Sequence, residues 1–395
     1  MSRPLKIALV AGEHSGDQLG FKLMRALREV AGEVVFMGVG GEAMEAEGLK
    51  SLFPMSDIAV MGIVPVVRRL RTILSRIRDT ADAVVAAKPE AFVIIDSPDF
   101  THRVARRVRA RLPTLPIIDY VSPSVWAWRP GRAKAMRAYA DCVLGLLPFE
   151  PDAYVRLGGP RCVYVGHPLI ERLNEFRPNP EEAARRAAAP PVVVVLPGSR
   201  RSEISRLMSD FGGALDALGD QIGVFEAVLP TLPHIEAEVR ARAAEWRQKP
   251  RIVTGEAAKF AAFRTARAAL AASGTVTLEL ALSGVPTVGA YKVGKVEEQL
   301  KYLIKVPSIL LPNLILGERA VPELLQKDCA PAALAAALAG VVRVGPVRTA
   351  QTDALSRLDA LMRLPDGRAP SAHAATAVLE TMARKTADPS RHNFQ

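Results

Sequence analysis

The stretch PPVVVVLPGSRRSE, residues 190–203, decides how this chain folds. Four valines and a leucine form an apolar run that is typical of a strand buried on both faces of a parallel sheet. Two prolines precede this run, and a polar turn leads from it into a helical pattern. A strand, a turn and a helix in this order make one β-α unit. Because the unit starts near the middle of 395 residues, it indicates that a second α/β domain begins here.

The same alternation of apolar runs and helical patterns extends over the rest of the chain. It predicts an α/β fold with two Rossmann-like, doubly wound domains facing a cleft. Strands are expected at residues 6–11, 33–38, 92–95, 117–121 and 142–147, and then at 192–196, 224–229, 251–254, 268–271 and 287–291. The expected divisions are an N-terminal domain at 1–168, a Pro- and Ala-rich linker with a short helix at 169–190, a C-terminal domain at 191–363, and a closing helix and tail at 364–395.

The composition narrows the class of protein. No long apolar leader with a small-residue cleavage site follows Met1, so a cytoplasmic location is expected. The uncharged stretches 329–342 and 306–317 are both shorter than the roughly 20 residues of a spanning helix. The three cysteines form no close pair, so the sequence predicts neither a zinc site nor a disulfide framework.

Positive charge is concentrated in one part of the chain. Residues 68–137 contain 15 Lys and Arg against 6 Asp and Glu, an excess of nine, within a total net charge of +11. At the start of this block, apolar residues at 63–77 recur with helical spacing, and five arginines lie within 68–78. Such a helix packs on a core with a solvated back, or it lies on an anionic membrane surface. The sequence leaves both interpretations open.

Two glycine-containing turns follow the first two strands. Residues 11–17, AGEHSGD, open a helix and let a ligand approach the backbone, although a capped structural turn explains them equally well. His14 is a weak candidate for a base. Residues 38–43, GVGGEA, match the dinucleotide pattern formally but follow the second strand, with Asp57 as the only acid near the required offset. A glycine-lined ligand site fits this turn better than NAD.

Two carboxylates follow the third expected strand. Asp96 and Asp99 are separated by Ser97 and Pro98, and the proline fixes the chain as it enters the next helix. Because ligands of open α/β sheets bind beyond the carboxyl ends of strands, these acids are catalytic candidates. The alternative is that Asp96 caps the helix and Asp99 adds a favourable charge to its first turn.

Two turns in the second half are typical of phosphate sites. Gly198, Ser199 and Arg200 stand at a helix N-terminus, where N–H groups and fixed positive charge attract anions. The turn 272–279, ASGTVTLE, has the same arrangement: Ser273, Gly274 and Thr275 are expected to hold a pyrophosphate, and Glu279 to accept hydrogen bonds from a ribose diol. Capped helices with solvated charges are the alternative for both turns.

In this order and placement the motifs resemble the lipid-A-disaccharide synthase family. The most specific pieces are YVSPSVWAW at 120–128 and PGSR at 197–200; others are the turns at 11–17 and 38–48, MGIV at 61–64, DSPDF at 96–100, GHP at 166–168, SGTVTLE at 273–279 and PN at 312–313. They extend from residue 6 to about 330.

The resemblance implies a glycosyltransferase B fold and an inverting, metal-independent hexosyltransferase without a cofactor. The implied donor is UDP-2,3-diacylglucosamine, the acceptor is 2,3-diacylglucosamine 1-phosphate, and the products are lipid A disaccharide 1-phosphate and UDP. Asp99 falls on the family's important aspartate, with Asp96 as a second catalytic candidate. The positions expected to bind acceptor or sugar are Glu13, Ser15, Gly16, Asp17, Gly40, Gly41, Met61 and Trp126; Arg200, Glu279 and Asn313 fall on the nucleotide side.

The expected partners are the two lipid sugars and an anionic membrane surface, with no nucleic acid. The location implied is peripheral, on the cytoplasmic face of the bacterial inner membrane. The sequence leaves open a monomer or a homodimer. Two other functions remain as alternatives: a UDP-N-acetylglucosamine 2-epimerase-like enzyme, which needs no acyl-binding surface, and a non-catalytic protein that binds lipid surfaces and releases no UDP.

Overall fold

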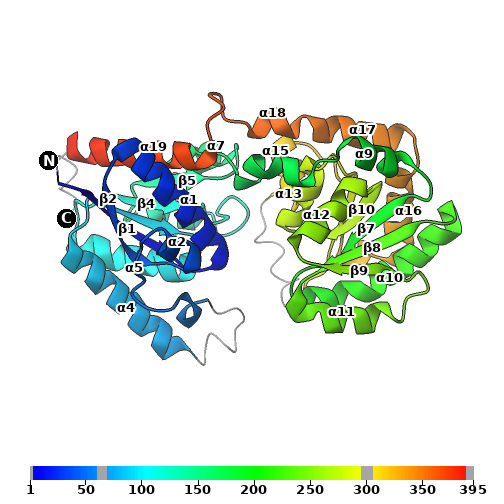
Figure 1. The fold of residues 1–395 in the computed structure, drawn as a ribbon, viewed down its shortest axis with the longest axis horizontal. Coiled ribbons are helices and arrows are strands. Elements are labelled where there is room, and N and C mark those ends of the chain that lie inside the picture. Colours follow the sequence, from blue (N-terminus) through cyan, green and yellow to red (C-terminus); the bar gives the residue numbers. More distant parts are fainter. Residues whose placement is uncertain (1–2, 60–68, 295–305, 388–395) are drawn as a thin grey trace. The chain divides into compact units, whose positions relative to one another are not determined.

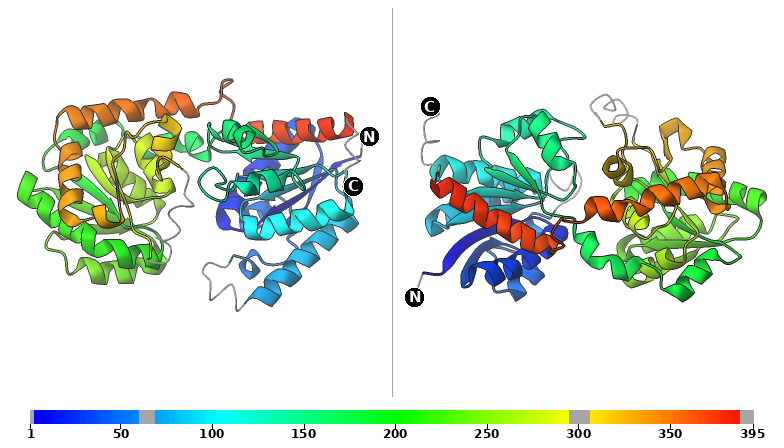
Figure 2. Two further views of the ribbon diagram at one scale, coloured as in Figure 1. Left: turned by 180° about the vertical axis from the view of Figure 1, so that it is seen from behind. Right: turned by 90° about the horizontal axis from the view of Figure 1, so that it is seen from above.

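The chain folds into two compact α/β units in a computed structural model that describes residues 3–59, 69–294 and 306–387. Unit 1 contains residues 1–168 and 364–395, and unit 2 contains residues 169–363. Each unit has a six-stranded sheet in which all strand pairs are parallel, with helices on both faces (Figures 1 and 2). The expected class, two doubly wound α/β halves, is confirmed.

The sheet of unit 1 has the order β2-β1-β3-β4-β5-β6. The chain therefore first adds a strand on one side of β1 and then returns to add four on the other. The strands are β1 (Leu5–Ala11), β2 (Val34–Val39), β3 (Ala91–Ile95), β4 (Ile117–Tyr120), β5 (Cys142–Gly145) and β6 (Arg161–Tyr164). All five residues of β3 are buried, because helices cover both faces of this central strand.

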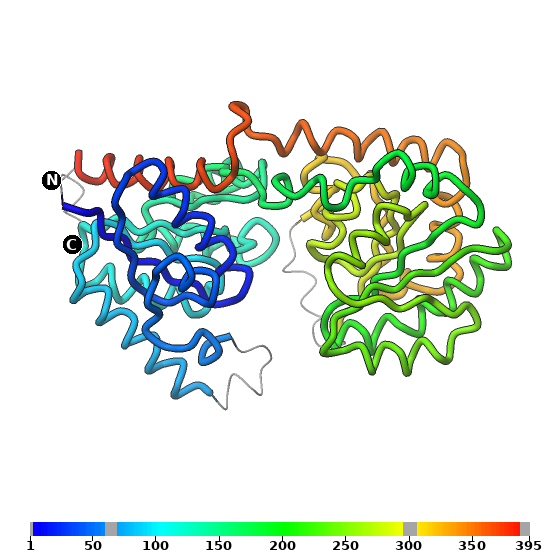
Figure 3. Tube along the Cα trace, viewed as in Figure 1, coloured from blue at the N-terminus to red at the C-terminus, as the bar shows by residue number. Residues whose placement is uncertain are grey.

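Two apolar layers enclose this sheet. On one face α1 (His14–Ala31) and α19 (Pro370–Ala387) pack against it, and on the other α4 (Leu70–Ala87), α5 (Pro98–Arg111), α6 (Gly131–Met136) and α7 (Glu150–Arg156) do so. The short α2 (Glu42–Ala46) follows β2. The C-terminal α19 lies beside α1, as the red and blue segments of the trace in Figure 3 show. The end of the chain thus completes the core of unit 1.

The sheet of unit 2 has the order β12-β11-β10-β7-β8-β9. Its strands are β7 (Val192–Leu196), β8 (Glu226–Thr231), β9 (Arg251–Thr254), β10 (Ala268–Ala272), β11 (Thr287–Tyr291) and β12 (Glu323–Leu325). The four valines of β7 are at most 2% exposed, so the run that opens the second half of the sequence is a central buried strand. One face of the sheet is covered by α10 (Arg201–Ile222), α11 (Glu236–Ala243) and α16 (Pro331–Val342).

The segment expected as a linker is largely helical and forms part of unit 2. Residues 169–190 contain most of η2 (Pro168–Arg172) and all of α8 (Leu173–Phe176) and α9 (Pro180–Ala187), and the two α-helices pack on α12 (Glu256–Thr265). The segment therefore belongs to unit 2 as a structured part, because Phe176 is fully buried against Phe260. The other helices are α13 (Thr275–Leu282), α15 (Leu311–Leu316), α17 (Pro346–Ser356) and α18 (Leu358–Met362).

Each sheet ends in an edge strand that the sequence did not predict. β6 has four residues, starts with an arginine and is half-buried throughout. β12 has three residues, ELL, and is also half-buried. Neither gives the fully buried apolar run that marks a central strand, because β6 starts with a charged residue and β12 has only three residues.

Among the described helices, none is by itself long and apolar enough to cross a membrane. The helix Pro331–Val342 and the following helical segment Pro346–Met362 pass this test of length and composition only when taken together, and they are bent by 75° with respect to each other.

Candidate active site

The first group of site residues lies where the strand order of unit 1 reverses, between β1 and β3. Ligands of open α/β sheets bind at such switch points, beyond the carboxyl ends of the strands. The turns after the two strands meet here, since Ser15 Oγ donates a hydrogen bond to Asp96 Oδ2 over 3.1 Å. Packing is so close that a Cβ atom at Gly12 would lie 2.4 Å from Cβ of Ser97. The fold thus joins two motifs that are far apart in the sequence.

The turn after β3 is strained. Asp96 and Ser97 have φ angles of 54° and 45°, and a non-glycine residue in this region costs on the order of 1–3 kcal/mol. Asp96 stabilises the turn with its own atoms: Oδ1 accepts a hydrogen bond from the Ser97 N–H at 2.7 Å, and its carbonyl accepts one from Thr101 Oγ1 at 2.7 Å. Together with the bond from Ser15, both carboxylate oxygens of Asp96 are used within the protein.

Asp99 has a different environment. It lies in the first turn of α5, and its side chain is 90% exposed. Its Oδ1 accepts a hydrogen bond from Arg132 Nη2 at 3.2 Å. The carboxylate thus lies between the positive end of the helix and a guanidinium. Asp99 therefore presents a charged, solvated carboxylate beside the strained turn.

Asp17 is a buried cap rather than an open ligand group. Its side chain is 1% exposed in total and accepts hydrogen bonds from the N–H groups of Gly41 (2.8 Å), Ala43 (3.1 Å) and Met44 (3.1 Å) at the start of α2. A Cβ atom at Gly41 would lie 2.7 Å from Asp17 Oδ2, and one at Gly40 would lie 2.8 Å from Cβ of Met44. The two glycines are therefore required by this packing, which explains them without a dinucleotide.

A cavity of about 680 Å³ lies beside this cap. Asp17, Gly40, Gly41 and the exposed His14 line it. Among the other expected positions, Glu13 is the N-cap of α1, and Gly16 is buried where a Cβ atom would meet the carbonyl of Ile95 at 3.3 Å. Asp57, the acid considered for a dinucleotide ribose, instead accepts two hydrogen bonds from Arg76 at 3.0 and 2.8 Å.

The side chain of Trp126 is held by a buried carboxylate that was not predicted from the sequence. Its Nε1–H donates a hydrogen bond to Glu150 Oε1 at 3.1 Å, and its ring packs edge-on against Phe149 with 5.1 Å between centroids. Glu150 is 3% exposed, and burial raises the pKa of its carboxyl to about 7. The Leu147 N–H donates to Glu150 Oε2 at 2.9 Å. A lone glutamate at a helix start gave no signal in the sequence.

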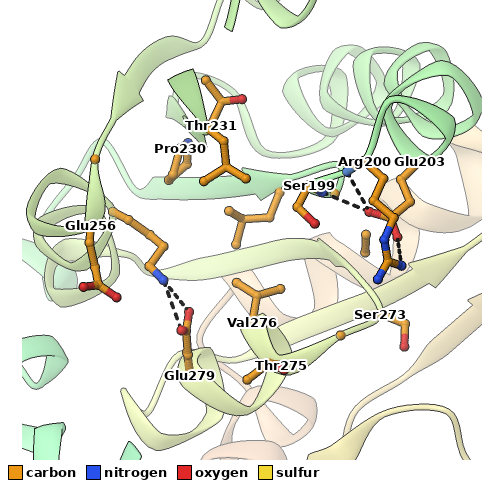
Figure 4. A pocket seen from close by; sticks show the side chains of 17 residues that line it. Ser199, Arg200, Glu203, Pro230, Thr231, Glu256, Ser273, Thr275, Val276 and Glu279 are labelled. Carbon is orange, nitrogen blue, oxygen red and sulfur yellow. Dashed lines mark hydrogen bonds and ion pairs between the residues drawn. The ribbon is translucent and has the colours of Figure 1, made fainter. Parts of the chain in front are cut away.

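The second group of site residues lies in unit 2, where the strand order reverses between β7 and β10. The turns after these two strands border a pocket of about 460 Å³. Seven of the eight residues expected to bind UDP line it: Gly198, Ser199, Arg200, Ser273, Gly274, Thr275 and Glu279. Figure 4 shows Ser199, Arg200 and Glu203 at one end of the pocket and Glu256 and Glu279 at the other.

The helix N-terminus of α10 is occupied by the protein's own carboxylate. Glu203 Oε2 accepts hydrogen bonds from the N–H groups of Ser199 (2.9 Å) and Arg200 (3.2 Å), and Oε1 accepts one from Arg200 Nη1 (3.2 Å). Free N–H groups were expected at these two residues, and the structure corrects this point. Gly198, with φ of 117°, admits the carboxylate, because a Cβ atom there would lie 2.4 Å from Glu203 Oε2.

The opposite end of the pocket contains an ion pair. Lys259 Nζ, on α12, donates hydrogen bonds to both oxygens of Glu279 at 3.0 and 2.8 Å. Thr275 and Val276, in the first turn of α13, line the pocket between the two ends. N–H groups in a first turn have no partner within their helix, so they are suited to bind an anion. Lys259 was not among the residues singled out from the sequence.

Asn313 does not line this pocket. Its side chain is 2% exposed, and its Nδ2 donates hydrogen bonds to the Val321 carbonyl and to Glu323 Oε1, both at 2.8 Å. Its Oδ1 accepts a hydrogen bond from the Val321 N–H at 2.8 Å. In this structure Asn313 fastens α15 to the segment that leads into β12.

Met61 lies outside the described residues, as does most of the N-terminal part of the expected amphipathic helix. Within residues 3–59, 69–294 and 306–387, no group of three or more His, Cys, Asp or Glu side chains is arranged to hold a metal ion.

Two parallel six-stranded sheets, each with polar turns at its switch point, define a protein of the glycosyltransferase B fold. Solved structures agree: a putative UDP-N-acetylglucosamine 2-epimerase from Listeria monocytogenes has a TM-score of 0.60 at 12% identity, covering 100% of both chains. MurG from Acinetobacter baumannii has a TM-score of 0.59 at 14% identity, covering 96% of this chain and 100% of that one. At such identities the likeness concerns the fold alone.

The family follows from the sequence comparisons. Residues 7–375 match the family model described as lipid-A-disaccharide synthetase. The lipid-A-disaccharide synthase of Bradyrhizobium diazoefficiens is 57% identical over 379 residues, covering 95% of this chain and 96% of the relative. That of Rhodospirillum centenum is 43% identical over 387 residues, covering 97% and 96%. The chain belongs to the lipid-A-disaccharide synthase family and is a glycosyltransferase of lipid A biosynthesis. The epimerase alternative has only the shared fold in its favour.

Proposed function

We propose that this enzyme transfers a 2,3-diacylglucosaminyl group from its UDP-linked donor to the 6-hydroxyl of 2,3-diacylglucosamine 1-phosphate. The acceptor oxygen forms a bond to the anomeric carbon of the donor while the bond from that carbon to UDP breaks. UDP leaves with the electron pair, and the anomeric configuration inverts. The proton of the acceptor hydroxyl passes to Asp99.

The accessibility of the two aspartates supports Asp99 as the base. A general base must reach the hydroxyl whose proton it takes. Asp99 has a 90% exposed carboxylate, whereas both oxygens of Asp96 accept hydrogen bonds from Ser15 and Ser97. Asp96 then acts by holding the strained turn in place. This difference in accessibility between the two carboxylates is the main support for Asp99 as the base.

The pocket of unit 2 supports the binding of UDP. The first turn of α13 is suited to the diphosphate, and Arg200 adds positive charge at the same pocket. Glu279 accepts hydrogen bonds from the ribose diol. UDP is therefore stabilised as it leaves by N–H groups and by Arg200, and we propose that the reaction needs no metal ion.

UDP release from purified protein tests the reaction. Release is expected only when acylated donor and acylated acceptor are both present; release without acceptor contradicts a transferase. Asp99→Asn is expected to lower turnover about 10²- to 10⁴-fold while UDP affinity stays within a factor of two. Near-normal turnover of Asp99→Asn would exclude it as the base. EDTA is expected to leave the rate unchanged, and a loss restored by magnesium would contradict metal independence.

We further propose that unit 1 rests on the cytoplasmic face of the inner membrane through the beginning of α4. Leu70 and Leu74 are 44% and 42% exposed there. The apolar residues in the later turns of α4 that pack on the sheet are, in contrast, mostly buried. Arg69, Arg71 and Arg78 are exposed on the same segment. Exposed leucines among arginines suit a surface of anionic lipid.

Flotation with vesicles of phosphatidylethanolamine and phosphatidylglycerol tests this location. The wild type is expected to float, and the double variant Arg69→Glu/Arg71→Glu to float at least fivefold less. The matched control, Arg240→Glu/Arg247→Glu, changes two exposed arginines of unit 2 and is expected to float like the wild type. Equal loss in both variants would show that net charge, not this segment, governs binding.

A further inference from the structure

The ammonium group of Lys259 is fixed from two sides. Its Nζ donates to both oxygens of Glu279, and it lies over the ring of Phe260 at 4.5 Å from the centroid. The two side chains of the ion pair are 23% and 12% exposed, so the pair forms part of the pocket wall and is shielded from bulk water. An ion pair with little exposure is screened far less than one on the surface.

A carboxylate in this pocket has an electrostatic cost. A nucleoside diphosphate adds at least two negative charges close to any acid beside it, and like charges in a partly enclosed pocket repel each other strongly. Glu203 at the other end is paired with Arg200, and Glu256 is paired with Arg172. Glu279 has Lys259 as its counter-charge.

We propose that Lys259 is a positioning residue of the nucleotide pocket: it neutralises Glu279, so that this carboxylate can remain beside the diphosphate of a nucleoside diphosphate while it accepts hydrogen bonds from the sugar. The inference rests on the proposed binding of UDP in this pocket. An ammonium with three N–H groups can keep two bonds to the carboxylate, and the carboxylate retains lone pairs for two hydroxyls. Lys259 thus acts through Glu279 and not through a bond to the phosphates.

Calorimetric affinities of UDP and uridine for four forms of the full-length protein test this role: wild type, Lys259→Met, Glu279→Gln and the double variant. Lys259→Met leaves Glu279 unpaired and is expected to weaken UDP at least tenfold but uridine less than threefold, because only UDP carries the diphosphate. Glu279→Gln is expected to weaken both ligands about equally. In the double variant the repelling charge is gone, so UDP is expected to bind at least threefold more tightly than to Lys259→Met.

Two controls separate charge from folding. Lys259→Arg keeps the counter-charge and is expected to bind UDP within threefold of the wild type. Lys249→Met removes an exposed lysine that precedes β9, and it is expected to leave UDP affinity unchanged. Thermal unfolding of each variant shows whether the fold is intact.

The outcomes distinguish a failure of the proposed role of Lys259 from a failure of the proposed binding of UDP. If Lys259→Met weakens UDP by the same factor in the wild type and in the Glu279→Gln variant, Lys259 contacts the phosphates directly and the inference is wrong. Equal weakening of UDP and uridine by Lys259→Met also overturns it. If the wild type binds no UDP at all, the proposed function of the pocket itself fails.

Discussion

His102 on α5 lies against Asp119 on β4, with 3.2 Å between Nε2 and Oδ2, and both side chains are buried. Nδ1 of the same imidazole is 2.9 Å from the Tyr139 hydroxyl. Among the described residues no hydrogen bond of good geometry reaches either oxygen of Asp119, so the imidazole is what compensates this buried carboxylate. The contact joins the helix that carries Asp99 to the sheet.

Replacing His102 by Leu is therefore expected to destabilise unit 1. It leaves a buried carboxylate without a partner, which typically costs about 3–5 kcal/mol. Denaturant unfolding of the full chain measures the loss. The double variant His102→Leu/Asp119→Leu removes both polar groups and is expected to regain most of it. UDP affinity is expected to stay unchanged, because the nucleotide pocket lies in unit 2; a parallel loss of UDP binding would contradict this separation.

Gly198→Ala is expected to damage the nucleotide pocket. The new Cβ would push Glu203 away from the N–H groups that it caps, and φ of 117° is strained for alanine. We expect a loss of stability of about 1–3 kcal/mol and at least tenfold weaker UDP binding. Gly219→Ala, in the last turn of α10 with only an ordinary contact to Phe225 at 3.7 Å, is the matched control and is expected to stabilise the protein. If both variants behave alike, the close approach of Glu203 is unimportant.

Thr231→Val is expected to weaken UDP binding and to stabilise the free protein. Thr231 lines the nucleotide pocket, is 9% exposed, and has a buried Oγ1 without a hydrogen-bond partner among the described residues. An unsatisfied buried hydroxyl costs about 1–3 kcal/mol, so the isosteric valine should raise the melting temperature of the free protein. UDP affinity should fall, since the ligand loses a hydroxyl to bind. Thr231→Ser is expected to keep the affinity; unchanged affinity of the valine variant would show that Oγ1 does not contact UDP.

Glu150 is expected to make unit 1 less stable as pH rises. Burial raises the pKa of its carboxyl from 4.5 to about 7, so between these values the unfolded chain releases a proton that the folded chain retains. Its contribution is fully present below pH 4.5 and is lost as pH rises through 7. The difference in unfolding free energy between Glu150→Gln and wild type should therefore shift by about 3 kcal/mol in favour of the variant from pH 4.5 to 8. If this difference in unfolding free energy did not change with pH, the raised pKa of Glu150 would be contradicted. Glu380→Gln, at an exposed position, is the control, and its difference from the wild type should not change with pH.

Much of the fold is readable in the sequence because buried parallel strands are continuous apolar runs. The run VVVVL of β7 and the buried β3 have this property, and both were placed correctly. The edge strands β6 and β12 were missed because an edge strand needs neither length nor a fully apolar composition. The packing of α8 and α9 on α12 was not predicted for the expected linker either, because it does not follow from the local composition.

The candidate site also contains residues that a local sequence pattern predicts and residues that it does not. The turns with Asp96 and with Ser273 were found because they follow strands and precede helices, which is a local property. Lys259 was not found, because nothing in its own helix distinguishes it from a solvated lysine. Its role depends on Glu279, a residue of another helix at hydrogen-bond distance.

The sequence by itself determined the two α/β halves, the family and the turns at the carboxyl ends of the strands, because these are written in local patterns of apolar and polar residues. Only the tertiary structure decided what each polar side chain does. It made Asp17 a buried cap and left Asp99 exposed, and it placed Glu203 on the N–H groups of the turn that contains Ser199. The physical reason is that a carboxylate takes its role from the donors that folding brings within about 3 Å of it.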